Sequence, residues 1–317
     1  QEGHTAHETE QEAHVMAKTM HHIYRDFMHD VLAIPVFAER KPPHERFAGA
    51  TETYTFEGIM PAGKALQMGT SHEISQSFAK AFDMTFQSRE GQQAYPYLTS
   101  WGVTTRMIGA VVMSHGDNKG LILPPKIAPY QIVIVPIFKT DTKESVLATT
   151  EQLAQELKKQ FRVTIDADDS TTPGAKFYTW EMKGVPLRIE IGPRDIEKNQ
   201  VVIVDRLEGI KEVCAFDALQ ETIDRKLTDL QNKLFERALK RRTTQWVVTD
   251  KSLEEIGPEL SEGGKFYQVG WGGDVEAVNE LKKYHGTIRC ILSTNESKTC
   301  FHTGKPSIYD IIIAKAY

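Results

Sequence analysis

The feature that most constrains this fold is an alternation of strand-like and helix-like segments between Gln131 and Arg241. The apolar run at 131–136 has the length of a buried strand. We expect strands at 131–136, 162–166, 187–191 and 201–205, and helices near 143–160 and 219–241. Segments that alternate in this way predict a compact α/β domain of about 100 residues. We place its start near Ala128, just after Pro124-Pro125.

The region before Pro124 has a different pattern. From Glu8 to Leu32 there is no Gly or Pro, and apolar residues recur at steps of three and four, which predicts an amphipathic helix. Alternating residues at 51–56 and a second strand that ends near Gly69 predict antiparallel pairing. We expect further strands at 33–37, 94–101, 120–123, 287–292 and 309–314, and helices near 73–82, 106–113 and 275–284.

Composition narrows the functional class. The chain has 317 residues, 40% of them hydrophobic and 26% charged, which is enough apolar material for two or three compact domains. No apolar run approaches the roughly 18 residues of a membrane helix, so no membrane span is expected. Three scattered cysteines suit a reducing cytoplasm better than a disulfide framework. With a net charge of −5, any contact with RNA has to be local.

A candidate phosphate-binding segment runs from Ser100 to Gly109. It leads from a strand through a turn of small residues into a helix, and it places Arg106 at the start of that helix. The Arg106 guanidinium and the free N–H groups of the first helical turn can bind a polyphosphate together. The alternative is an arginine that caps the helix or pairs locally, and these residues alone leave both open.

Three further segments belong with the Arg106 segment. They are Gln1-Glu-Gly-His-Thr-Ala-His7, Lys64-Ala-Leu-Gln-Met-Gly-Thr-Ser-His72 and Gly120-Leu-Ile-Leu-Pro-Pro125. Together they resemble class II aminoacyl-tRNA synthetases in the form found in prolyl-tRNA synthetases. The Arg106 segment with 120–125 resembles the third signature motif, 1–7 resembles the tail of the second, and 64–72 resembles the Gln-x-Gly-Thr-Ser-His segment of that family. The similarity continues through 173–177 and 184–195 to the terminal Ala-Lys-Ala-Tyr317, so it covers essentially the whole chain.

The resemblance implies a mixed α/β fold in three parts. Residues 1–127 would be the carboxy-terminal part of the antiparallel-sheet catalytic domain of a class II synthetase. Residues 128–238 would be an α/β anticodon-binding domain, and residues 239–317 a small α/β domain. The family's first motif and the arginine of its second motif would lie upstream of Gln1, so we interpret the chain as truncated at its N-terminus and expect it to be inactive in amino acid activation by itself.

The resemblance also implies an activity and its site residues. The protein would activate proline with ATP and Mg²⁺ to prolyl-adenylate and transfer it to tRNA(Pro). Arg106 would be the catalytic residue. The residues implied to bind ATP are Gln67, Thr70, Thr104 and Arg106, and those implied to bind proline are Glu2, His4, His72, Trp101 and Gly102. The alternative for each His and Glu is a local cap or ion pair.

For tRNA, the resemblance points to a surface in the middle domain. The implied anticodon-binding residues are Lys176, Glu181, Arg188, Glu190 and Arg194, with Trp180 as a stacking ring. Lys240-Arg-Arg242 is a further phosphate contact or, equally, a basic helix end that complements the helix dipole.

Two metal hypotheses are not favoured. The histidines at 7, 14, 21, 22 and 29 recur near every seventh residue, which places them about two helical turns apart, so we expect a solvated polar face. Relatives with structural zinc in the last domain carry two Cys pairs. Here 269–274 has no Cys, and Thr303 stands where the partner of Cys300 is expected, so we predict no zinc.

The remaining expectations concern the intact protein. The family resemblance implies a homodimer and a cytoplasmic location. The short distance between the motifs at Gln1 and Ser100 leaves no room for a large inserted editing domain. We therefore expect the eukaryote-like architecture, which lacks that domain. The alternative function is a catalytically inactive fragment or paralogue that binds tRNA.

Overall fold

The computed structural model describes residues 1–293 and 299–317. The chain divides into two compact units. The first comprises residues 1–30, 34–114 and 238–317, and the second comprises residues 31–33 and 115–237. The division into three domains stays a prediction.

The described part of the first unit contains one sheet of nine strands. Its strands are antiparallel except for the last pair, β14 and β13. In spatial order they are β1 (Glu2–His7), β7 (Tyr97–Val103), β4 (Ala65–Ser75), β3 (Glu52–Ile59), β2 (Val36–Arg40), β15 (Gly286–Ile291), β16 (Tyr309–Lys315), β14 (Phe266–Trp271) and β13 (Trp246–Val248). The antiparallel pairing expected for the amino-terminal region is confirmed, and the carboxy-terminal strands extend the same sheet.

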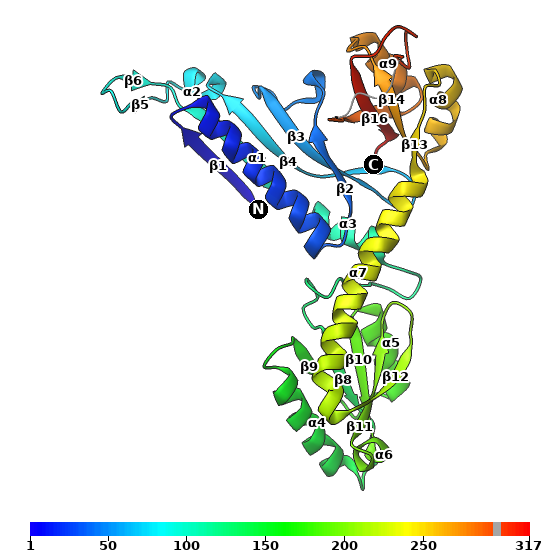
Figure 1. The fold of residues 1–317 in the computed structure, drawn as a ribbon. Helices are drawn as coiled ribbons and strands as arrows, with labels where there is room; N and C mark the ends of the chain where they lie inside the picture. Colours follow the sequence, from blue (N-terminus) through cyan, green and yellow to red (C-terminus); the bar gives the residue numbers. More distant parts are fainter. Residues whose placement is uncertain (294–298) are drawn as a thin grey trace. The chain divides into compact units, whose positions relative to one another are not determined.

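Helix α1 (Glu10–Asp26) lies across one face of the amino-terminal strands (Figure 1). It begins at a capping box formed by Thr9 and Glu12 and continues into a π-helical turn at Phe27–Val31. The other helices of this unit are α2 (Ser77–Ala81), α3 (Arg106–His115), α8 (Leu253–Glu262) and α9 (Val275–Lys283). Short elements complete it: a 3-10 turn at Pro43–Glu45 and the hairpin strands β5 (Phe86–Gln87) and β6 (Gln93–Ala94).

The buried face of α1 differs from the expected one. Val15 and Ile23 belong to the apolar repeat that predicts this helix but are 52% and 50% exposed, whereas Ala17 and His21 are buried. The His21 ring stacks on Phe56 of β3 with 5.2 Å between ring centroids. The expected solvated histidine face is therefore wrong at His21, because its ring takes the place of an apolar side chain against the sheet.

The second unit contains a five-stranded sheet with helices packed on it. In spatial order its strands are β12 (Lys211–Ala215), β11 (Gln200–Asp205), β10 (Leu187–Ile191), β8 (Ile132–Pro136) and β9 (Val163–Ile165). Its helices are α4 (Lys143–Leu157), α5 (Pro173–Met182), α6 (Pro193–Glu197) and most of α7 (Leu219–Gln245), which follows a 3-10 turn at Phe216–Ala218. Strand β8 pairs in parallel with β9 and β10, which confirms the α/β domain that the alternation predicts.

One strand prediction is wrong. Residues 120–123 form no strand, because the backbone N–H groups of Leu121 and Leu123 bond to the last residue of α5 and to the turn that follows it rather than to a neighbouring strand. Leu121 donates to the carbonyl of Met182 at 3.0 Å, and Leu123 donates to that of Gly184 at 3.2 Å. The segment is therefore a loop that is held at the end of α5 by these two backbone hydrogen bonds.

Among the described residues, the helices are all too short or too polar to traverse a lipid bilayer.

Candidate functional site

The side chains of β1, β7 and β4 form two rows on the face opposite α1, which we call the open face. In the first row Glu2 pairs with Gly102, and Gly102 pairs with Thr70. Directly paired residues of antiparallel strands point to the same face of a sheet. The register therefore brings together three of the residues predicted to bind proline or ATP.

The second row lies beside the first. His4 pairs with Ser100, and Ser100 pairs with His72. The His4 ring is 2.8 Å from the Glu2 carboxylate, and both side chains are exposed. The two rows thus join a carboxylate and two imidazoles on one surface, which suits a ligand with both an ammonium and a carboxylate group.

Trp101 lies on the other face. It pairs with Ser71, whose hydroxyl donates to the carbonyl of Ala17 in α1 at 2.9 Å. A Cβ atom added at Gly3 would overlap the Trp101 indole, which shows how closely the ring covers that glycine. Only the backbone of Trp101 borders the open face, whereas Gly102 leaves that face without a side chain between Glu2 and Thr70.

The environment of His72 keeps its ring neutral. Burial lowers the pKa of His72 to about 4. Its Nδ1 lies 3.0 Å from the hydroxyl of Thr53, and the ring of Phe47 lies 5.0 Å away between centroids. At neutral pH His72 therefore offers an uncharged imidazole that is fixed in place by Thr53.

Arg106 is placed as the sequence predicts, at the first residue of α3. Its side chain is exposed, and its Nη1 donates to the carbonyl of Gln67 at 3.0 Å. The hydroxyl of Thr104 accepts from the backbone N–H of Arg106 at 3.2 Å. Arg106, Gln67 and Thr104 are thus brought together at one end of β4 and β7, with most of the guanidinium free for an anion.

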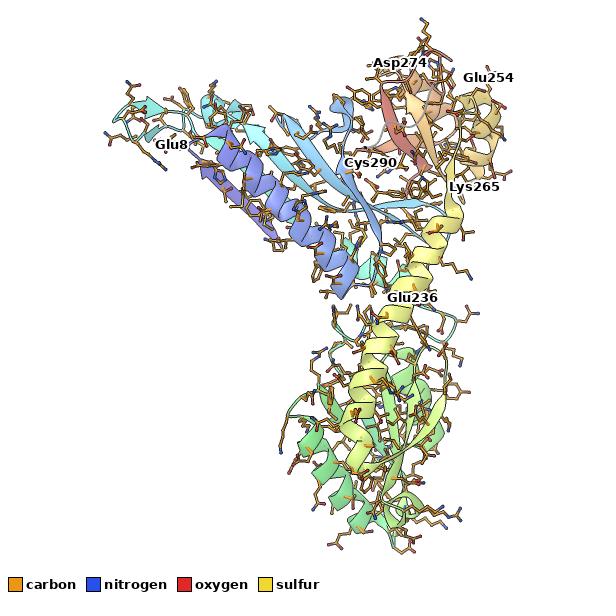
Figure 2. The ribbon with its side chains drawn as sticks, viewed as in Figure 1. Glu8, Glu236, Glu254, Lys265, Asp274 and Cys290 are labelled. Carbon is orange, nitrogen blue, oxygen red and sulfur yellow. The ribbon has the colours of Figure 1, made fainter. Side chains whose placement is uncertain are left out.

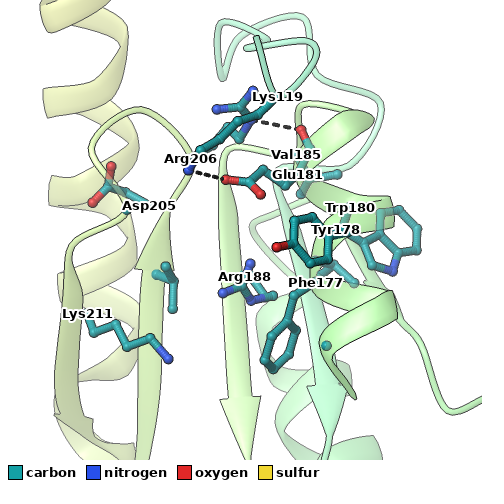
Figure 3. A pocket seen from close by; sticks show the side chains of 14 residues that line it. Lys119, Phe177, Tyr178, Trp180, Glu181, Val185, Arg188, Asp205, Arg206 and Lys211 are labelled. Atoms are coloured by element: carbon teal, nitrogen blue, oxygen red, sulfur yellow. Dashed lines mark hydrogen bonds and ion pairs between the residues drawn. The ribbon is translucent and has the colours of Figure 1, made fainter. Parts of the chain in front are cut away.

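The second unit has a cavity of about 380 Å³ beside its sheet (Figure 3). Its lining includes the rings of Phe177, Tyr178 and Trp180 and the cations Arg188 and Lys211. The Arg188 guanidinium stacks over Phe177 at 4.1 Å, and Tyr178 is 75% exposed. Aromatic rings beside the partly buried Arg188 and the exposed Lys211 suit an unpaired nucleic acid base and its phosphate.

The predicted anticodon-binding residues are only partly gathered at this cavity. Glu181 and Arg188 line it, and Glu190 holds Arg188 through a 2.9 Å ion pair. Lys176 is buried and donates to the carbonyl of Asp166 at 2.9 Å. Arg194 is exposed on α6 and is not part of the lining.

The basic run at the end of α7 has its own contacts in the first unit. Arg241 donates to the carbonyl of Ser114 at 2.8 Å, and Arg242 donates to that of Val36 at 3.1 Å. The Arg242 guanidinium also lies over the Phe37 ring, and its burial lowers the pKa of Arg242. Both arginines therefore anchor the end of α7.

A polar cluster lies in the last part of the chain, where relatives with structural zinc carry their Cys pairs. His302 Nδ1 lies 3.1 Å from an Asp274 carboxylate oxygen, and Cys300 is buried beside them. In the part of the chain that the structure describes, no three His, Cys, Asp or Glu side chains are arranged to hold a metal ion. The absence of zinc stays a prediction.

Several site residues were not identified from the sequence. Thr53 and Ser100 join the open face through strand register, which the sequence does not specify. Tyr178 and Lys211 join the cavity. The run Lys176-Phe-Tyr-Thr-Trp180, with aromatic residues beside a lysine, was a signal that could have identified Tyr178.

Comparisons with known proteins agree with this geometry. A family model of the class II tRNA synthetase core domain (G, H, P, S and T) matches residues 1–115, and an anticodon-binding domain model matches residues 131–226. The chain is 46% identical over its whole length to a proline–tRNA ligase of Acetoanaerobium sticklandii, 45% to one of Alkaliphilus oremlandii and 42% to one of Porphyromonas gingivalis.

The chain spans 66%, 66% and 65% of the lengths of these relatives, respectively. The first aligns over 321 positions, so it carries no large insertion within this stretch. Both matched domains occur in the order that the sequence motifs predict, and the register of β1, β7 and β4 unites residues from all three motifs. The chain belongs to the proline–tRNA ligase family of class II aminoacyl-tRNA synthetases.

Proposed function

We propose that the protein containing this chain is a proline–tRNA ligase. The carboxylate of proline attacks the α-phosphorus of ATP and pyrophosphate leaves. A hydroxyl at the 3′ end of tRNA(Pro) then attacks the carbonyl carbon of prolyl-adenylate, and AMP leaves. The observation that carries this proposal is the open face, where Glu2, His4 and His72 lie beside Thr70. The identity to ligases covers both matched domains, which does not favour a fragment that only binds tRNA.

Proline would lie on the two rows of the open face. The Glu2 carboxylate is exposed and can pair with the secondary ammonium of the substrate. His72 is neutral at physiological pH and can form a hydrogen bond without adding charge beside the reacting carboxylate. Gly102 lets the substrate approach the strand backbone closely.

ATP would lie toward Arg106. Its guanidinium can offset charge that grows on the phosphates as pyrophosphate leaves, which is stabilisation by positioning and electrostatics without a protein nucleophile. Thr104 and Gln67 hold Arg106 by direct hydrogen bonds. Mg²⁺ would arrive with ATP as part of the substrate, and the side-chain oxygens of Gln67 and Thr70 are neutral ligands of the type that it accepts.

The tRNA anticodon would bind at the cavity of the second unit. Tyr178 and Arg188 offer stacking surfaces, while Glu181 can accept hydrogen bonds from a base edge. Glu190 fixes the plane of Arg188. Lys176 is buried, so it would contribute indirectly, by holding Asp166 in place. Arg194 would contact the RNA outside the cavity.

The cellular setting follows from the family. We propose a cytoplasmic enzyme that acts as a homodimer when intact, with no structural zinc. These features rest on the family resemblance and on the cysteine pattern.

Pyrophosphate exchange by the full-length enzyme tests the proposal. Wild type should exchange pyrophosphate into ATP only when proline is present. Arg106→Ala should slow exchange by a factor on the order of 100, the cost of one preorganised transition-state contact. Arg106→Lys should restore little, because a point charge does not reproduce the planar fork of a guanidinium.

Arg89→Ala is the matched control, since Arg89 is an exposed arginine paired with Glu8 at 2.9 Å. It should exchange like wild type, and filter-bound tRNA affinity of Arg106→Ala should stay within a few-fold. Exchange that does not depend on proline would refute the proposed substrate. Near-normal exchange in Arg106→Ala would show that Arg106 only caps the helix or pairs locally.

A further inference from the structure

A buried ion pair joins the carboxy-terminal strands of the first unit to β3. Glu57 on β3 is fully buried. Arg289 on β15 donates to its Oε2 from Nε at 3.0 Å and from a second guanidinium nitrogen at 2.8 Å. Lys41, only 3% exposed, lies 3.3 Å from Oε1 of the same carboxylate. The charge of the Glu57 carboxylate is therefore balanced by two cations in a buried environment, where removal of one partner would leave an uncompensated charge.

The carboxylate lies where the pairing of β3 with β4 shifts. Phe56 pairs with Gly69, but the next residue, Glu57, pairs with Gln67, so Met68 is the extra residue of a bulge. A bulge changes the direction of neighbouring side chains and fixes where the register changes. The position of Glu57 therefore sets the register of β4 at Gln67.

Arg289 also lies in a bulge. In the pairing of β15 with β16, Ile288 is opposite Ile313 and Cys290 is opposite Ile312, so Arg289 has no partner in the ladder. Cys290, labelled in Figure 2, marks this place in the fold. The bulge frees the Arg289 side chain from the alternation of its strand, and its two hydrogen bonds to Oε2 of Glu57 identify that carboxylate as its partner.

The pair is connected to the predicted ATP-binding residues on two sides. Through the ladder, Glu57 is paired with Gln67, whose carbonyl accepts from Arg106 at 3.0 Å. Through its side chain, Glu57 Oε1 accepts from the hydroxyl of Thr55 at 2.9 Å, and Thr55 is paired with Thr70. A shift of the carboxylate would thus displace both Gln67 and Thr70, which are the two ends of the predicted ATP-binding segment of β4.

We propose that Arg289 and Glu57 are positioning residues for ATP, through which the carboxy-terminal strands support amino acid activation. This inference rests on the proposed function for the identity of the nucleotide site. Neither side chain touches the substrate. They fix the register of β4, and with it the carbonyl that holds Arg106. Misplacement of a binding group by about 1 Å can cost up to roughly 100-fold in rate, so a small change of register has a measurable effect.

The test replaces the charged cluster without leaving a buried charge. Lys41→Met, Glu57→Leu and Arg289→Met are combined in the full-length enzyme, because hydrophobic replacement of a whole buried ionic cluster is often neutral for stability. We expect a thermal midpoint close to wild type, a dissociation constant for ATP raised about tenfold by calorimetry, and a KM for proline within twofold. A merely structural cluster would leave the affinity for ATP unchanged once folding is restored.

Two single variants complete the experiment. Arg289→Lys keeps the charge but loses the bidentate contact, and it should weaken ATP binding several-fold. Gln268→Met is the control. It removes a buried 2.9 Å hydrogen bond between β14 and β16 to Asp310, and it should lower the thermal midpoint without changing ATP affinity.

The outcomes separate this inference from the proposed function. A folded triple variant that binds ATP like wild type overturns the inference. If the triple variant does not fold, wild-type ATP affinity in Arg289→Lys overturns it. Calorimetry with ATP needs no turnover, so the inference is decided even if wild type shows no proline-dependent exchange, a result that would refute the proposed function instead.

Discussion

Acid should destabilise this chain through two histidines, His21, which is buried, and His72, which is partly buried. Burial against Phe56, together with the positive charge of Lys18, lowers the pKa of His21 to about 4, and burial alone does the same to His72. In the unfolded chain each ring has its ordinary pKa of 6.5. Between these two values the unfolded state binds more protons than the folded state, so stability falls as the pH decreases.

The size of the effect follows from the two pKa values. Each histidine contributes stability that is fully present above pH 6.5 and is lost toward pH 4, at about 1.4 kcal/mol per pH unit. From pH 7 to pH 5 this amounts to about 2 kcal/mol for each ring. The two together should lower the free energy of unfolding by about 4 kcal/mol, which is a large part of the stability of an ordinary domain.

Urea unfolding at pH 7 and pH 5 measures this loss. His21→Phe keeps a ring against Phe56 and removes the proton, so its loss should be about 2 kcal/mol smaller than that of wild type. His22→Phe, a change at an exposed neighbour on the same helix, controls for the loss of a histidine and should behave like wild type. An equal loss in wild type and His21→Phe would show that the His21 ring is not held neutral by the fold.

Three further predictions concern the fold, the RNA surface and metals. Gly63→Val should lower the free energy of unfolding by about 2 kcal/mol or more in urea titrations, because Gly63 has a φ of 66° and its added Cβ would overlap the backbone of Gly264. Tyr178→Ala should weaken tRNA binding by about 1 to 3 kcal/mol in filter assays and leave ATP affinity unchanged, since its exposed ring is placed to stack on a base; an unchanged tRNA affinity would remove Tyr178 from the RNA surface. Elemental analysis should find well under one zinc per chain, and chelation should leave the thermal midpoint unchanged. A stoichiometric, stabilising zinc would contradict the prediction that Thr303, in place of a second Cys, rules out a zinc site.

Strand β1 shows what the sequence could not reveal. The apolar run at 131–136 predicts β8 directly, because a strand buried on both faces has a continuous apolar sequence. Strand β1 instead alternates Glu2, His4 and Ala6 with Gly3, Thr5 and His7, so neither face is distinctly apolar. Its pairing with β7 is visible only in the fold, and the open face depends on that pairing.

Trp101 and Gly102 show where a strand boundary mattered. The strand predicted at 94–101 ends at Trp101, whereas β7 includes both residues, and successive residues of a strand point to opposite faces. Which of the two borders the open face requires tertiary information. Ser71, the partner of Trp101 in β4, bonds to α1, and this assigns the Trp101 indole to the helix-covered face.

The junction between the amino-terminal and carboxy-terminal strands explains why one ion pair can affect the site. Strand β15 joins β2 through a single register pair, Ile291 with Arg40. Backbone bonds from Tyr317 to Ala65 and from Gly264 to Gly63 also cross the junction, but neither involves β3. At β3 the junction contains the buried contact of Arg289 with Glu57, beside an apolar cluster that includes Phe37 and Phe266. The apolar cluster is non-directional and tolerates small displacements, whereas two hydrogen bonds from one guanidinium to a carboxylate restrict both distance and angle. The ion pair is therefore the component of this junction that can hold β3, and through it the ATP-binding segment of β4, in one register.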